Sequence, residues 1–184
     1  MARTSPSKAG NLEWRAAAEL RANGRMLVGY AATFDTEARV GGMREIVRAG
    51  AFRDTLANGG DVLALVDHNP RQVLGRTRAG TLRLTEDQRG LAFELDVPET
   101  TTGRDVLALA ERGDIGGMSF GFNVRPGGEQ RSGGRRELRA LDLMEISVVH
   151  AFPAYQGTSV EARGDAPEPP GVARARRLLE SYER

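Results

Sequence analysis

Large apolar residues alternate with small or polar ones along residues 117–124, GMSFGFNV. Successive side chains of an extended chain point to opposite faces, so the methionine and the two phenylalanines are expected on one face. Ser119 and Gly121 are then expected on the other face. The pattern predicts a strand that turns an apolar face toward a core and carries Ser119 among small residues.

Two further segments have the pattern of strands. DVLALV at residues 61–66 is a short apolar run bounded by turn residues, which predicts a buried strand leading directly into Asp67 and His68. In LMEISVV, every second residue from Met144 onward is apolar, so Met144 is expected on the core face and Glu145 on the opposite one.

Turn residues predict two hairpins. An Asn23-Gly24 step separates two candidate strands and is typical of a two-residue turn. Residues 81–97 alternate on both sides of a polar DQRG turn and predict a second hairpin. The Ala-rich arm before Asn23 fits a helix as well as a strand, and both interpretations stay open at this point.

Two segments have the spacing of helices. The apolar residues of 101–114 recur at helical intervals up to Gly113, a typical stop signal, and a shorter helix is expected over 51–57. The polar, Gly-rich residues 125–137 are expected to form a loop. Many short strands with two inserted helices predict a mainly β fold with flanking helices (α+β), either a small β-barrel or a compact sheet.

Length and composition fit one domain of ordinary size. The chain has 184 residues, with residues 11–160 as the folded part. Residues 1–10 are short and polar and are expected to be disordered. Residues 161–184 have the composition of a linker followed by a short basic amphipathic helix.

Charge and cysteine content restrict the function. The formal net charge is only +1, which gives no global field for nucleic acid or an anionic membrane, and neither is expected as a partner. The absence of cysteine excludes disulfides, thiolate metal sites and cysteine nucleophiles. With no long apolar run and no leader pattern at the start, the sequence predicts a soluble intracellular protein.

Three residues are candidates for catalysis. His68 follows a predicted buried strand, where a rigid element can present a proton-transfer group at its edge. Ser119 has the hydroxyl of a nucleophile, and Glu145 has the carboxylate that could orient an imidazolium. Each also has an ordinary structural interpretation: a loop histidine, a small filler and a solvent-facing acid. Asp67 and His150 compete with Glu145 for the third role.

Glycines surround the candidate nucleophile. Gly116, Gly117 and Gly121 leave room for a carbonyl to approach Ser119, and they mark the expected substrate and oxyanion region. Residues 117–121 also match the string G-x-S-x-G, but that motif requires a strand–turn–helix setting, whereas here the strand pattern continues. The two histidines have no metal-ligand spacing, so neither a metal nor another cofactor is expected.

Five segments in this order resemble the prohead (capsid maturation) protease family of tailed phages, which is related in fold to the herpesvirus assembly protease. The resemblance extends over residues 20–162. It implies a closed β-barrel of the herpesvirus protease type, flanked by helices. The segments are GYAATFDT, GAFRDTL, LVDHNPRQVLGRT, GMSFGF and LMEISVVHAFPAY.

The resemblance also implies a function and roles for residues. It implies a serine endopeptidase that cleaves scaffold, major capsid protein and itself inside the immature procapsid, in the host cytoplasm. The family's nucleophile falls on Ser119 and its general base on His68. The third position, a histidine in herpesvirus relatives, falls on Glu145, with His150 and Asp67 as reserve candidates.

Other expectations and alternatives accompany this assignment. Dimerisation activates the herpesvirus branch, so a homodimer is one option, and residues 161–184 are a candidate segment for self-cleavage. Two other functions stay open: a non-catalytic scaffolding or binding module of capsid assembly on the same barrel, and an unrelated esterase or amidase built on a Ser-His pair.

Overall fold

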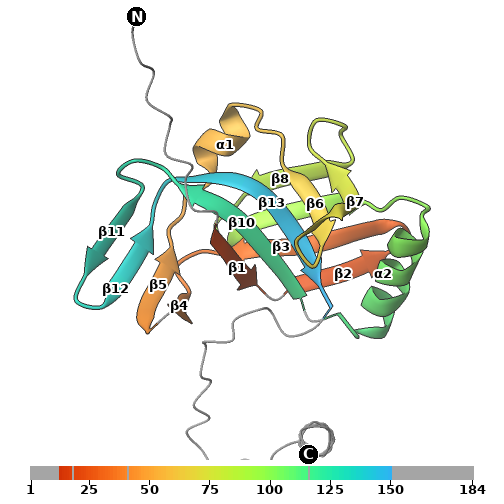
Figure 1. The fold of residues 1–184 in the computed structure, drawn as a ribbon, viewed down its shortest axis with the longest axis horizontal. Coiled ribbons are helices and arrows are strands. Elements are labelled where there is room, and N and C mark those ends of the chain that lie inside the picture. The colour runs from red at the N-terminus through yellow and green to blue at the C-terminus, as the bar shows by residue number, and fades with distance from the viewer. Residues whose placement is uncertain (1–12, 18, 41, 116, 151–184) are drawn as a thin grey trace, which may run out of the picture.

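The computed structural model describes residues 13–17, 19–40, 42–115 and 117–150. Strands dominate this part of the chain and form three sheets, with two helices at the periphery (Figure 1). The expected disordered residues 1–10 and the expected linker and basic helix at 161–184 lie outside the described residues, as does Gly116. No helix of the described part is long and apolar enough to cross a membrane.

The first sheet contains the two strands that carry Ser119 and Glu145. Its neighbours are antiparallel except for β13 and β6, which are parallel. Met118, Phe120 and Phe122 of β10 are at most 2% exposed, which confirms the alternation expected for this strand. The strand order is β1 (Glu13–Ala17), β10 (Gly117–Val124), β13 (Leu141–Val149), β6 (Leu63–Val66) and β7 (Asn69–Arg76).

The second sheet is antiparallel throughout and contains both predicted hairpins. Asn23 pairs with Met26, so Gly24 and Arg25 form a two-residue turn, with Gly24 at a φ of 60°. The Ala-rich arm before this turn forms strands, because pairing with β10 and β3 overrides the helix propensity of its residues. The strand order is β2 (Glu19–Asn23), β3 (Met26–Thr33), β9 (Gly90–Asp96) and β8 (Leu82–Glu86).

The third sheet corrects one expectation, because the loop expected at residues 125–137 contains a hairpin. Gly133 and Gly134 both have positive φ and form its two-residue turn, which suits the twist of paired strands. The flanking residues are charged rather than apolar, so hydrophobic periodicity gave no strand signal. The strand order is β11 (Glu129–Ser132), β12 (Arg135–Leu138), β5 (Met43–Val47) and β4 (Glu37–Val40).

The two helices lie close to the predicted positions. In α2 (Thr101–Arg112), the Thr100 side chain accepts a hydrogen bond from the Gly103 N–H at 3.1 Å, and Gly113 ends the helix in the left-handed conformation. In α1 (Arg53–Ala57), the buried Thr55 hydroxyl bonds to the backbone of β13. Thr55 thereby attaches α1 to the strand that carries Glu145.

An apolar core fills the space between the first two sheets. The Phe120 ring packs edge-on against Phe52 at a centroid distance of 5.5 Å and stacks on Phe122 at 5.4 Å. Ile146 and Val148 of β13 join the same core and are at most 1% exposed. Burial of such side chains contributes about 1.5–3 kcal/mol each, which fixes the register of β10 and β13.

The mainly β architecture with flanking helices is confirmed, whereas closure into a barrel is not. Among the described residues, β1 and β7 are edge strands of the first sheet, so no sheet closes on itself. β7 packs beside β8 and β9, and β1 packs beside β3, so the sheets approach each other without one continuous ladder of hydrogen bonds. The closed barrel stays a prediction of the resemblance.

One extra residue interrupts β13 where it pairs with β10. Gly121 and Phe122 are consecutive, but their partners, Glu145 and Leu143, are two residues apart, so Met144 forms a β-bulge. Met144 is 45% exposed, and Leu143 is buried instead. The expectation that Met144 faces the core is therefore wrong, because the bulge shifts the alternation of the strand by one residue.

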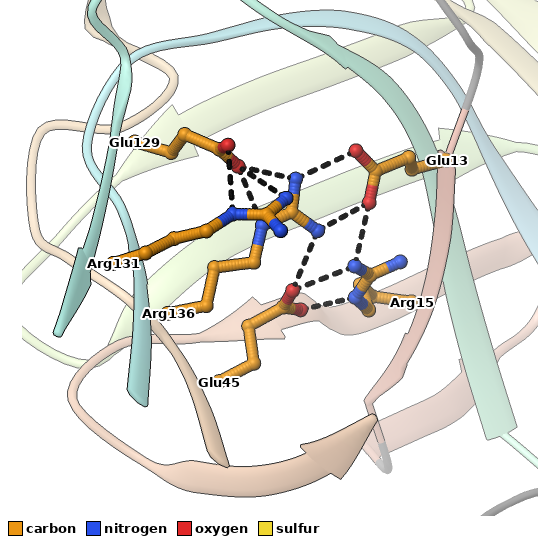
Figure 2. A network of polar contacts seen from close by, with 6 residues as sticks. All are labelled: Glu13, Arg15, Glu45, Glu129, Arg131 and Arg136. Atoms are coloured by element: carbon orange, nitrogen blue, oxygen red, sulfur yellow. Dashed lines mark hydrogen bonds and ion pairs between the residues drawn. The ribbon is translucent and has the colours of Figure 1, made fainter. Parts of the chain in front are cut away.

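A network of ion pairs joins β1 to the third sheet (Figure 2). Arg15 binds both carboxylate oxygens of Glu45, one of them at 2.6 Å, and contacts Glu13 at 2.7 Å. Arg136 contacts Glu45 at 3.0 Å, Glu13 at 2.7 Å and Glu129 at 2.6 Å. Arg15, Glu45 and Arg136 are buried, so carboxylates and guanidiniums compensate one another away from water.

Candidate active site

His68 occupies a tight turn between β6 and β7. Val66 pairs with Asn69, which leaves Asp67 and His68 as a two-residue turn with φ values of 47° and 57°. Both residues are left-handed, as in a type I′ turn, a conformation that normally favours Asn and Gly. Positive φ costs a residue with a side chain on the order of 1 kcal/mol or more and is frequent at functional sites.

The Glu145 carboxylate contacts the His68 imidazole. Glu145 Oε1 lies 2.6 Å from His68 Nδ1, a short distance that is typical of a charge-assisted hydrogen bond. Glu145 comes from the middle of β13 and is 5% exposed, whereas His68 is half-buried. Because an ionised carboxylate only accepts, Nδ1 carries the proton in this pair, and Nε2 is the nitrogen that can take a proton.

Ser119 lies on the same face of the sheet as Glu145. Ser119 pairs with Ser147 and Gly121 pairs with Glu145, and directly opposite residues of an antiparallel pair project to one face. Since Phe120 is in the core, this face is the one directed away from it. β10 and β6 flank β13, so the nucleophile candidate and the strand that leads to His68 lie on either side of Glu145.

Ser147 is a residue that pattern reading did not single out. Its hydroxyl accepts a hydrogen bond from the His68 backbone N–H at 3.1 Å and donates to Glu145 Oε2 at 2.6 Å. The sequence placed Ser147 beside Glu145 on one strand face, but nothing in a single serine indicated a polar network. Its partner at His68 comes from 79 residues away, which only the fold reveals.

Asp67 and His150, the reserve candidates, bond to each other. The Asp67 carboxylate accepts a hydrogen bond from the His150 backbone N–H at 3.0 Å and contacts His150 Nδ1 at 2.8 Å. Both bonds connect the turn that carries His68 to the end of β13. Of the three candidates for the third role, Glu145 is the one that the structure places on His68 Nδ1.

The glycine region lies at the start of β10. Gly117 pairs with Val149 and has a φ of 143°, which a residue with a side chain rarely adopts. Gly121 faces Glu145 with no side chain between the strands.

The described residues of this region do not form a set of metal ligands. Among the residues that the structure describes, no three His, Asp or Glu side chains gather as metal ligands. The site instead combines an imidazole, a buried carboxylate and a serine on one sheet face. This combination suits acyl transfer by a serine nucleophile with a histidine base.

Comparison with known proteins connects this site to a family. The sequence profile of the caudovirus prohead serine proteases matches residues 11–168. Among solved structures, the bacteriophage T4 capsid assembly protease, gp21, has a similar fold, with a TM-score of 0.55 at 10% sequence identity. The superposition covers 76% of this chain and 98% of the gp21 chain. No curated protein sequence matches this chain.

Proposed function

The chain belongs to the caudovirus prohead serine protease family, and from that premise we propose that it is a serine endopeptidase that cleaves the major capsid protein and scaffold of its own procapsid. The proposal assigns Ser119 as nucleophile, His68 as general base and Glu145 as third member of a catalytic triad. It places the reaction inside the immature procapsid, in the host cytoplasm.

One observation supports this proposal above the others. The Glu145 carboxylate lies 2.6 Å from His68 Nδ1, on the sheet face that also carries Ser119. A carboxylate in this position holds the imidazole in the tautomer that exposes a basic Nε2, and it stabilises the imidazolium that forms during catalysis. A binding module would not need this orientation of a histidine beside a serine.

Each residue then has a defined step. His68 Nε2 takes the Ser119 proton as the hydroxyl oxygen attacks a peptide carbonyl, and the imidazolium returns the proton to the leaving amine. Water then attacks the acyl-serine ester with His68 again as base, and the ester bond breaks as the imidazolium returns the proton to the Ser119 oxygen. Backbone N–H donors to the oxyanion contribute about 3 kcal/mol each, and the glycines around Ser119 are the proposed place where they approach the substrate.

All three residues come from a single copy of the chain. The triad therefore needs no side chain from a second copy, and the homodimer stays an open expectation. Self-cleavage is proposed within residues 161–184, where the sequence is rich in small residues and prolines.

The test is co-expression with the cognate major capsid and scaffold proteins. Wild type is expected to process both partners and to lose mass at its C-terminus, whereas Ser119→Ala is expected to do neither. Ser132→Ala, in the exposed strand β11, is the matched control and is expected to behave as wild type. Full processing by Ser119→Ala would refute the assignment and would favour a binding module.

A further inference from the structure

The His68–Glu145 contact is one member of a closed ring of three hydrogen bonds. Glu145 Oε1 contacts His68 Nδ1, Glu145 Oε2 accepts from the Ser147 hydroxyl, and the same hydroxyl oxygen accepts from the His68 backbone N–H. The ring connects both ends of the histidine, its backbone and its imidazole, to one carboxylate. Ser147 is the member that joins them.

Ser147 is placed where its hydroxyl has no alternative partner in water. The residue is 0% exposed, on the central strand of the sheet, between β10 and β6. Its register partners are Ser119 on β10 and Leu65 on β6. Loss of the hydroxyl would leave a buried carboxylate oxygen and a backbone N–H without this partner, which is costly for a charged acceptor.

The turn that carries His68 has a strained backbone, and the bonds from β13 hold it in place. Asp67 and His68 both have left-handed φ values, so the backbone pays a conformational cost at the point where the base is attached. Such residues persist only where surrounding bonds hold them. The Val148 carbonyl accepts from the Asp67 N–H at 2.9 Å, and Ser147 accepts from the His68 N–H, so two consecutive residues of β13 hold the turn.

We propose that Ser147 is a positioning residue for catalysis: it fixes the Glu145 carboxylate and the His68 backbone in one arrangement, so that the imidazole is oriented toward Ser119. The inference rests on the proposed function, since it concerns the rate at which Ser119 reacts. Ser147 touches neither the substrate nor the transferred proton. Its effect passes through Glu145 and is absent when Glu145 no longer supports the base.

The test uses reaction of Ser119 with a fluorophosphonate, which requires an activated serine but no knowledge of the natural cleavage site. Rates are measured for wild type, Ser147→Ala, Glu145→Gln and the double variant, and the labelled peptide is identified by mass. Ser147→Ala is expected to slow labelling about 10- to 30-fold, the effect of one hydrogen bond to a charged group. In the Glu145→Gln background, the same change is expected to slow labelling less than about threefold.

A matched control separates positioning from stability. Thr55→Val removes another buried hydroxyl that makes two hydrogen bonds to β13, at Leu141 and Leu143 and thus outside the ring of His68, Glu145 and Ser147. This variant is expected to be less stable than wild type but to label at the same rate. If Ser147→Ala does not fold, Ser147→Cys replaces it, because a thiol fills a similar space but forms only weak hydrogen bonds. Ser147→Cys is then expected to slow labelling as well.

The outcomes are distinct for the two proposals. No labelling of wild type at Ser119 would overturn the proposed function. Labelling of wild type together with an unchanged rate in Ser147→Ala, or in Ser147→Cys if it is used instead, would overturn the positioning role alone. Equal slowing in the wild-type and Glu145→Gln backgrounds would also overturn it, because additivity means that Ser147 acts independently of the carboxylate.

Discussion

Neutralisation of Glu13 is expected to destabilise the folded chain by about 3 kcal/mol at neutral pH and by much less near pH 2. Hydrogen bonding to Arg136, followed by Arg15, lowers the pKa of the Glu13 carboxyl to about 2 from an ordinary value of 4.5, despite the opposing effect of burial. The difference, 4.5 − 2, is 2.5. At about 1.36 kcal/mol for each tenfold change in acid dissociation, linkage gives about 3 kcal/mol.

The sign follows from the direction of the shift. A carboxyl whose pKa is lower in the folded state than in the unfolded state stabilises the fold at any pH above 4.5. This stabilisation declines as the pH falls below about 5, is reduced to about half near pH 3, and is nearly absent at pH 2. Glu13→Gln removes the charge at every pH, so its difference from wild type follows the same curve.

Urea unfolding at pH 7, 5 and 3 measures this difference. Glu99→Gln is the control, because Glu99 pairs with Arg25 at a surface where its side chain is 75% exposed, and such pairs contribute at most about 1 kcal/mol. The reasoning about Glu13 is refuted if its substitution costs less than about 0.5 kcal/mol at pH 7. A cost that does not change between pH 7 and pH 3 would refute it too, since linkage requires the change.

Two further predictions concern the site and the packing. Glu145→Gln is expected to slow cleavage on the order of 10⁴-fold, as in other triads whose acid is neutralised. His150 contacts Asp67, so His150→Gln is expected to slow cleavage less than about tenfold. Rates of peptide-bond cleavage measure both effects, and the opposite ranking would assign the third triad role to His150 instead of Glu145. Gly90→Ala is expected to lower the free energy of unfolding by about 1–3 kcal/mol, because a Cβ there would lie 2.0 Å from the Ala32 carbonyl oxygen. A melting temperature equal to that of wild type would contradict this close approach.

Local signals in the sequence predicted the elements with strong patterns. The alternation through Phe120 and Phe122 identified β10, and Gly113 marked the end of α2. These predictions succeeded because burial of large side chains and a left-handed helix stop depend on residues close together in the sequence. The Asn23-Gly24 hairpin succeeded for the same reason.

Features that depend on distant partners were not predictable. The hairpin of β11 and β12 has charged residues, and its stabilising contacts include the pairing of Arg136 with Glu13, 123 positions away. The bulge at Met144 was also missed, because its presence depends on how β10 and β13 pair across the core. No window of a single strand contains this information.

The candidate site was predictable in its residue types but not in its connections. His68 and Glu145 were selected from a strand end and an acid in an apolar strand, and the structure brings them together at 2.6 Å. Ser147 was missed because serine is common and its role depends on two partners from different positions of the fold. Asp67 and His150 could not be separated from Glu145 by spacing; in the structure they contact each other, whereas Glu145 contacts His68.

The bulge at Met144 places two residues, Met144 and Glu145, between the two core-facing segments of β13, where a regular strand has one. Before the bulge, Leu141 and Leu143 face the core, and after it Ile146 and Val148 do. Deletion of Met144 would leave Glu145 alone between Leu143 and Ile146, so regular alternation would replace the bulge and Glu145 would stay on the face of Ser119. The side on which the acid lies is thus set by its neighbours Leu143 and Ile146 rather than by the extra residue, and chimeras or designs that splice this strand have to keep both of these core positions.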